Sequence, residues 1–268
     1  MSFNRKPLGI KTILKSIISK TGYQIVRRVK PQLPVQEEYR GRYQVDGLEF
    51  DFVTPYATYA PWYQDAEFME TYSKIKNHTL VDIFRCHELW EIAGTIHNLD
   101  NSASFIEVGV WRGGTAAIIA KKLSILQARN SFYLADTFKG VVKASDKDFS
   151  YNGGEHADTS IEIVKELLDD KYDNLKIIVG IFPDETAHLI DPGEKFGFCH
   201  IDVDVYESAK DIVDWIWKRL IPGGIIVFDD YGFSSCTGII KYVNEQKKLN
   251  DRIILHNLNG HAIMIKVH

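Results

Sequence analysis

Four aspartates form the most informative pattern in this chain of 268 residues. Asp202 and Asp204 follow one short apolar run, and Asp229 and Asp230 follow the next. Carboxylates at neighbouring strand ends repel one another unless a cation lies between them. Oxygen ligands favour a hard cation, Mg²⁺ first, with Mn²⁺ and Ca²⁺ as alternatives. One aspartate of each pair would otherwise cap the following helix, but two doublets together favour a metal site.

A glycine-containing turn follows the first apolar run of the same region. Gly109 allows a tight turn, and Gly113 and Gly114 allow a ligand to approach the backbone where the next helix begins. The spacing is not that of a dinucleotide-binding turn, because Trp111 stands where the second glycine would be. Glu107, just before the turn, suits a ligand with an ammonium group. Packing alone is the alternative role for these glycines.

Asp136 ends the next apolar run, where a carboxylate accepts hydrogen bonds from both hydroxyls of a ribose. A helix N-cap is the alternative role for this side chain. The run after it ends in Gly180 and Ile181, which offer an apolar wall for an adenine ring. An ammonium site, a ribose site and an adenine site together fit S-adenosylmethionine. The expected cofactor contacts are Glu107, Gly109, Gly113, Gly114, Asp136, Thr137, Phe138, Gly180, Ile181 and Asp202.

The elements that position these residues are read from the alternation of short apolar runs and helical patterns after Ser104. We expect strands at Phe105–Val108, Phe132–Ala135, Leu175–Val179, Phe198–Ile201, Ile225–Phe228, Arg252–His256 and Ala262–Val267. We expect helices over residues 114–128, 160–169, 184–190, 206–220 and 237–248. The first five strands have nearly continuous apolar runs, as in a parallel sheet covered on both faces. The last two strands form a hairpin, so the fold class is an open α/β sheet.

The chain before this sheet divides into an arm and a cap. Residues 1–36 hold eight Lys or Arg and no Asp or Glu, and their apolar residues follow a helical period. This basic, amphipathic arm is expected to pack on the body or on a dimer partner, or to lie on an anionic membrane surface. Residues 37–100 are an aromatic-rich cap with a lead-in helix from about Thr79 to Ile96, and residues 101–268 are the catalytic domain.

Composition narrows the function further. The chain is 45% hydrophobic and 25% charged, and its mean hydropathy of −0.18 argues against a transmembrane helix. Three scattered cysteines fit a reducing compartment, so we expect a cytoplasmic protein, peripheral at the inner membrane face if the arm binds lipid. The net charge is −4, so with +8 on the arm the rest carries −12. An acidic body disfavours binding to nucleic acid.

Four segments of the chain form a recognisable set: Glu107-Val-Gly-Val-Trp-Arg-Gly-Gly114, Ala135-Asp-Thr-Phe-Lys-Gly140, Ile201-Asp-Val-Asp-Val-Tyr-Glu-Ser208 and Pro222-Gly-Gly224 with Phe228-Asp-Asp-Tyr-Gly232. With them, the chain resembles the macrocin O-methyltransferase family, which methylates sugar hydroxyls on macrolide and aminocoumarin antibiotics. The resemblance extends over about residues 80–267. The resemblance implies a Rossmann-like class I methyltransferase fold with a mostly parallel seven-stranded sheet. It also implies metal ligation by Asp202, Asp229 and Asp230 and a general base at Asp204. The converse, Asp204 as ligand and Asp202 as base, stays open.

The acceptor is less defined than the donor. Val203 stands where the antibiotic enzymes commonly have glycine, and residues 141–160 stand where those enzymes have a proline-rich stretch. The substrate pocket is therefore expected to differ, and a surface-polysaccharide precursor is as suitable an acceptor as an antibiotic sugar. Substrate contacts are expected from His156, Asp158, Tyr206 and Tyr231. The alternatives are a catechol-like acceptor, disfavoured because Val205 replaces the lysine base, a metal-dependent hydrolase, and a non-catalytic binding module. His200 is expected to be a core histidine.

Overall fold

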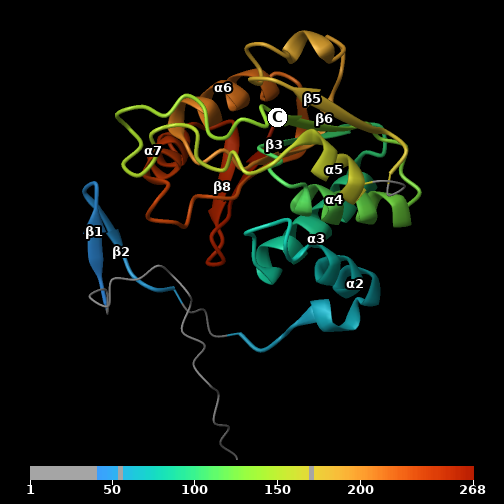
Figure 1. The fold of residues 1–268 in the computed structure, drawn as a ribbon, viewed down its shortest axis with the longest axis horizontal. Coiled ribbons are helices and arrows are strands. Elements are labelled where there is room, and N and C mark those ends of the chain that lie inside the picture. Colours follow the sequence, from blue (N-terminus) through green and yellow to red (C-terminus); the bar gives the residue numbers. More distant parts are fainter. Residues whose placement is uncertain (1–40, 54–56, 169–171) are drawn as a thin grey trace, which may run out of the picture. The chain divides into compact units, whose positions relative to one another are not determined.

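A seven-stranded sheet forms the centre of the computed structural model, which describes residues 41–53, 57–168 and 172–268 (Figure 1). The strands are β3 (Ser104–Val108), β4 (Phe132–Asp136), β5 (Leu175–Val179), β6 (Phe196–Ile201), β7 (Leu220–Phe228), β8 (Arg252–His256) and β9 (Ala262–Lys266). They lie in the order β5-β4-β3-β6-β7-β9-β8. The first five are parallel, and β9 runs antiparallel to both β7 and β8. The expected sheet and C-terminal hairpin are confirmed.

Successive side chains of the central strands enter two separate cores, because they point to opposite faces of the sheet. The main helices are α2 (Ala66–Ile75), α3 (Ile83–Leu99), α4 (Gly114–Ile125), α5 (Ile161–Leu168), α6 (Tyr206–Ile216) and α7 (Thr237–Gln246). Ile106 and Val108 pack with α6 and α7, whereas Phe105 packs with α2, α3 and α4 (Figure 1). Of the predicted helix at 184–190, the structure has only the 3₁₀ turn η2 (Ala187–Leu189).

The lead-in helix α3 begins at Ile83, four residues later than the pattern suggested. Asp82 has extended backbone angles, and its carboxylate accepts hydrogen bonds from the backbone N–H groups of Phe84 and Arg85. This N-cap satisfies donors that have no partner within the helix. It also fixes Arg85 in the first turn of α3, beside the sheet edge.

The aromatic segment contains the hairpin β1 (Tyr43–Val45) and β2 (Leu48–Phe50), the short helix η1 (Pro61–Gln64) and α2. Residues 42–268 form one compact unit, and side chains of α2 and α3 share a core with α4. The boundary expected at residue 100 therefore lies inside a continuous core. Residues 1–36, with the dimer and lipid contacts expected of them, lie outside the described residues. No helix in the described part of the chain is long and apolar enough to cross a membrane.

Candidate active site

A cavity of about 310 Å³ lies at the carboxyl ends of the five parallel strands. This is the edge at which open α/β sheets bind their ligands. Of the residues expected from the sequence, the cavity is lined by Gly109, Asp136, Thr137, His156, Gly180, Ile181, Asp202, Asp204, Asp229 and Asp230. Its described lining does not include Glu107, Gly113, Gly114, Phe138, Asp158, Tyr206 or Tyr231. The structure thus gathers ten of the expected residues around one cavity and places the other seven outside its described lining.

Gly109 is required by the way β3 leaves the sheet. Its φ is +87°, and a Cβ at this position would lie 1.7 Å from the carbonyl oxygen of Asp202. The Asp202 N–H in turn donates to the carbonyl of Val108 at 3.0 Å. The ends of β3 and β6 are thus in direct backbone contact, which brings the turn of the first strand beside the first aspartate.

Gly113 and Gly114 bring protein, and not a ligand, close to the backbone. A Cβ on Gly114 would lie 2.5 Å from the carbonyl oxygen of His78, to which the Gly114 N–H donates. Gly113, at φ +84°, is the N-cap of α4 and faces Val164 of α5. The packing role left open for these glycines is therefore the one that the structure supports.

The Asp136 carboxylate closes the glycine turn from the neighbouring strand. Its Oδ2 accepts from the N–H groups of Val110 and Trp111 at 2.6 and 2.8 Å, and its Oδ1 accepts from the N–H of Phe138 at 2.7 Å. A carboxylate has about four acceptor positions, so about one remains for a ligand hydroxyl. Asp136 thus serves the local backbone first, and its oxygens face the cavity while doing so.

Glu107 lies on the α3 side of the sheet, fully buried. Its carboxylate accepts from Thr115 Oγ1 at 3.0 Å and contacts His200 Nδ1 at 3.2 Å. Glu107 and His200 are register partners on the parallel strands β3 and β6, which explains their contact. The expected direct contact of Glu107 with an ammonium group thus has no support from the cavity lining.

Asp202, Asp229 and Asp230 each offer an oxygen within 4.8 Å of the other two. Within the described residues, no donor or cation contacts the Asp202 carboxylate, and Asp230 accepts only from the Asp204 N–H at 3.0 Å. Burial, with repulsion from Asp229, raises the pKa of Asp202 well above its ordinary value. Burial, with repulsion from Asp204 and Asp202, does the same to the pKa of Asp230. Attraction by His200 and Arg85 opposes the shift at Asp202 but does not outweigh burial and repulsion.

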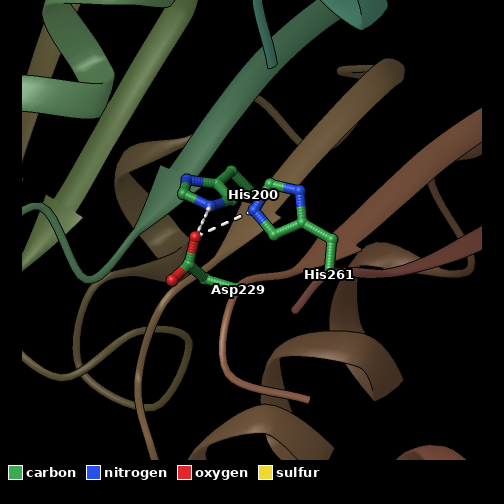
Figure 2. Close-up of side chains that lie close together, drawn as sticks. All are labelled: His200, Asp229 and His261. Atoms are coloured by element: carbon green, nitrogen blue, oxygen red, sulfur yellow. Dashed lines mark hydrogen bonds and ion pairs between the residues drawn. The ribbon is translucent and has the colours of Figure 1, made fainter. Parts of the chain in front are cut away.

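Asp229 differs because cationic and imidazole groups surround it. Arg85 donates to its Oδ2, and His261 Nε2 and His200 Nε2 lie 2.9 and 3.6 Å from its Oδ1 (Figure 2). Burial alone would raise the pKa of Asp229, but attraction by Arg85 and the two histidines lowers it. His261 Nδ1 contacts Glu88 Oε2 at 2.5 Å. The sequence analysis missed Arg85, Glu88 and His261.

Asp204 reaches the cavity through a turn. Strand β6 ends at Ile201, and Asp204 has a φ of +66°. The alternation of a continuing strand, which would put Asp204 on the same side as Asp202, therefore does not apply. Tyr151 donates to Asp204 Oδ1 at 2.5 Å, and His156 Nε2 lies 4.0 Å from Oδ2. Burial raises the pKa of Asp204, although the Tyr151 hydrogen bond opposes the shift.

Three expected substrate contacts have structural partners instead. Asp158 accepts from Arg112 Nη2 at 2.6 Å and from the Trp111 indole at 2.9 Å, which ties the 141–160 loop to the glycine turn. The hydroxyls of Tyr206 and Tyr231 donate to the side chains of Glu245 and Asn244 on α7. His156 alone of the four lines the cavity, where Tyr151 joins it from the same loop.

Known O-methyltransferases are similar to this chain in sequence. Mycinamicin III 3''-O-methyltransferase of Micromonospora griseorubida is 26% identical over 193 residues, which cover 66% of this chain and 74% of that enzyme. A second relative is 26% identical over 195 residues, covering 66% of this chain and 71% of its own. It is the 8-demethyl-8-(2,3-dimethoxy-alpha-L-rhamnosyl)-tetracenomycin-C 4'-O-methyltransferase of Streptomyces olivaceus.

Solved structures share the fold. The O-methyltransferase NovP superposes with a TM-score of 0.63 at 18% identity, over 77% of this chain and 98% of its own. The calicheamicin methyltransferase CalS11 superposes with a TM-score of 0.57 at 16% identity, and the match covers 82% of this chain and 99% of CalS11. The O-methyltransferase from Bacillus cereus, solved in complex with SAH, superposes with a TM-score of 0.50 at 17% identity. This match covers 76% of this chain and 91% of that enzyme. The model of the family described as Macrocin-O-methyltransferase (TylF) matches residues 71–264, so the chain belongs to this family of O-methyltransferases with the class I fold.

Proposed function

We propose that this enzyme transfers a methyl group from S-adenosylmethionine to a hydroxyl of a sugar-containing acceptor, assisted by a divalent cation. The observation that carries the proposal is a single cavity lined both by the turn around Gly109 and Asp136 and by the four aspartates. Two relatives of the chain are named for methylation of glycosylated compounds, mycinamicin III and a rhamnosyl tetracenomycin. The acceptor proposed here is therefore a sugar on a natural product or on a surface-polysaccharide precursor.

The donor half of the cavity fits a nucleoside cofactor. Gly109, Asp136, Thr137, Gly180 and Ile181 line it, and Asp136 retains about one free acceptor position for a ribose hydroxyl. The neighbouring Phe182 adds apolar surface suited to an adenine ring. When bound, S-adenosylmethionine supplies a methyl group on a positively charged sulfur. The acidic neighbourhood of Asp202 is electrostatically suited to that charge.

The acceptor half fits a hard cation. Asp202, Asp229 and Asp230 bring three carboxylate oxygens within 4.8 Å of one another, which is the chemistry that Mg²⁺ prefers in proteins. Mn²⁺ and Ca²⁺ are the alternatives. A bound divalent ion lowers the pKa of a hydroxyl and orients its oxygen. The role of these three side chains is then to fix the ion beside the donor turn.

Asp204 is the proposed general base. It lies in the same cavity, and its raised pKa moves it toward the range in which a carboxylate takes a proton effectively. Tyr151 orients one oxygen by its hydrogen bond, which leaves Oδ2 for the acceptor proton. His156, 4.0 Å from that oxygen and partly exposed, lies where it can pass the proton to solvent.

The catechol-like alternative lacks its lysine base at the expected position. Val205 occupies the position of the catechol enzymes' lysine, and its side chain is fully buried in the core. A metal-dependent hydrolase would not need the cofactor-binding turn around Gly109 and Asp136. A non-catalytic binding module would need neither this turn nor the aspartate cluster.

The proposal is tested by incubating the full chain with methyl-labelled S-adenosylmethionine and a panel of acceptors. The panel contains nucleotide-linked deoxysugars, glycosylated macrolides, polysaccharide precursors and catechols. We expect label in a sugar O-methyl group, loss of the rate in chelator and recovery with Mg²⁺. Methylation of catechols alone would overturn the acceptor class, and full activity in chelator would remove the metal. Absence of S-adenosylhomocysteine binding would favour a binding module.

A further inference from the structure

Asp229 belongs to a second group of possible metal ligands, together with two histidines that the methyl-transfer site does not use. His200 from β6 and His261, the residue before β9, both point toward Oδ1 of Asp229 (Figure 2). One ligand atom from each of the three residues lies within 4.8 Å of the other two, and all three side chains are buried. Two imidazoles and a carboxylate are a ligand set typical of Zn²⁺ and related transition metals.

The separations suit such an ion. Zn²⁺ bonds to nitrogen or oxygen are about 2.1 Å long, so tetrahedral ligands lie roughly 3.4 Å apart. The distances from Asp229 Oδ1 are 2.9 Å to His261 Nε2 and 3.6 Å to His200 Nε2. Small rotations of the two rings would equalise them.

Each imidazole is also oriented as a metal ligand is. Histidines that bind metals usually direct their other ring nitrogen to a carboxylate, which fixes the ring and its tautomer. His261 Nδ1 contacts Glu88 Oε2 at 2.5 Å, and His200 Nδ1 contacts Glu107 Oε2 at 3.2 Å. Two Glu–His pairs from different elements therefore direct their Nε2 atoms at one carboxylate oxygen.

One of these nitrogens lacks a partner. His200 Nε2 is fully buried and has no hydrogen-bond partner among the described residues. A buried polar atom left without a partner is costly, and such atoms often mark an ion that would complete the site. Arg85 does not block the position, because it binds the other oxygen, Oδ2. Asp229 and Arg85 line the cavity, so the three residues lie directly beside it.

We propose that His200, His261 and Asp229 form a second metal site, which takes a transition-metal ion of the Zn²⁺ class and shares Asp229 with the carboxylate site. Three carboxylates, Glu88, Glu107 and Asp229, surround the two imidazoles, and Arg85 offsets one of them. A divalent ion balances the remaining charge. The alternative to a bound ion is a proton on each imidazole, which would supply the positive charge instead.

The test uses the full chain freed of metal by chelator and then titrated with Zn²⁺ by calorimetry and with Co²⁺ by visible absorption. We expect one strongly bound equivalent of Zn²⁺ and the intense bands of four-coordinate, nitrogen-ligated Co²⁺. His200→Gln and His261→Gln should each weaken Zn²⁺ binding at least about tenfold, and Glu88→Gln should weaken it by a smaller factor. His188→Gln, an exposed histidine on η2, is the matched control.

Two further variants separate this site from its neighbours. Asp202→Asn should keep Zn²⁺ binding while weakening Mg²⁺ binding, so failure of the proposed methyl-transfer metal would not be confused with failure of this one. Cys236→Ser should also keep Zn²⁺ binding, since Cys236 belongs to a different group with Asp204 and Asp230. If the histidine variants do not fold, X-ray absorption of the Zn²⁺-loaded wild type decides between two imidazole ligands and none. Weak six-coordinate Co²⁺ bands, a sulfur ligand, or Zn²⁺ affinity unchanged in both folded histidine variants would overturn the site.

Discussion

The two halves of the cavity handle charge in opposite ways. In the donor half, three backbone N–H groups bind the Asp136 carboxylate. In the acceptor half, the Asp202 carboxylate has no donor or cation among the described residues, and Asp230 has a single backbone N–H. A group that the fold already satisfies maintains local shape, whereas buried carboxylates without partners call for an ion. The comparison separates the part of the site built by the chain alone from the part that a ligand completes.

The largest expected effect lies in the acceptor half, at the base. Asp204→Asn should lower kcat by about 10²–10⁴-fold, since the variant cannot accept the hydroxyl proton. Affinities for Mg²⁺ and S-adenosylhomocysteine, measured by calorimetry, should stay near wild type, and extra Mg²⁺ should not restore the rate. Asp214→Asn, on the exposed face of α6, is a matched control. A shifted Mg²⁺ requirement with a near-normal maximal rate would exchange the roles of Asp202 and Asp204.

Removal of a proposed metal ligand should have a smaller and reversible effect. Asp202→Asn or Asp230→Asn should raise the Mg²⁺ concentration needed for half-maximal activity by at least about tenfold, and excess Mg²⁺ should restore part of the rate. Titration of activity with Mg²⁺ measures the shift. If both variants keep the wild-type Mg²⁺ dependence, the carboxylate cluster does not bind the ion. The conclusion that a ligand completes the acceptor half of the cavity would then be wrong.

A change in the donor half should leave the metal alone. Asp136→Ala should weaken S-adenosylhomocysteine binding at least about tenfold, because charge-assisted hydrogen bonds contribute about 1.5–3 kcal/mol. Part of the loss would come from the turn, since Val110 and Trp111 lose the acceptor of their N–H groups. Calorimetry of the cofactor product measures the change, and Mg²⁺ binding is the internal control. NAD binding in place of S-adenosylhomocysteine would contradict the donor assignment.

The same contrast explains what could be predicted from the sequence. The strand ends and their aspartates were predictable because apolar runs mark buried parallel strands, whose carboxyl ends share one edge. Arg85, Glu88 and His261 were not, because they meet Asp229 from α3 and from the start of β9, with no spacing that links them to it. A buried aspartate requires compensation from somewhere. That requirement was visible in the sequence, but the group that meets it was not.

Gly114 and Tyr151 show two other limits of sequence reasoning. A glycine pattern does not say whether the close backbone neighbour is a ligand or protein, and at Gly114 the neighbour is the His78 carbonyl. The loop that holds His156 was identified, but its path was not, so Tyr151, the residue that bonds Asp204, was overlooked. Loop geometry depends on contacts such as Asp158 with Arg112, and these are set by the tertiary fold.

The smallest expected effect concerns stability and isolates Asp202 in the metal-free protein. Burial raises the folded-state pKa of Asp202 above its unfolded value of about 3.9, so its ionisation opposes folding and stability is lost as pH rises from the unfolded pKa towards the folded pKa. Asp202→Asn removes this penalty. In chelator, the melting temperature of the variant minus that of the wild type should therefore grow as pH is raised from about 4 to neutral. Asp229 acts in the other direction, since its lowered pKa makes stability fall as pH falls, but it is common to both proteins and cancels in the difference.

Added Mg²⁺ should reverse the sign of the difference, because the ion stabilises only the protein that keeps the ligand. A difference that stays flat across this range would mean that the folded chain already compensates the Asp202 charge, as it does that of Asp136.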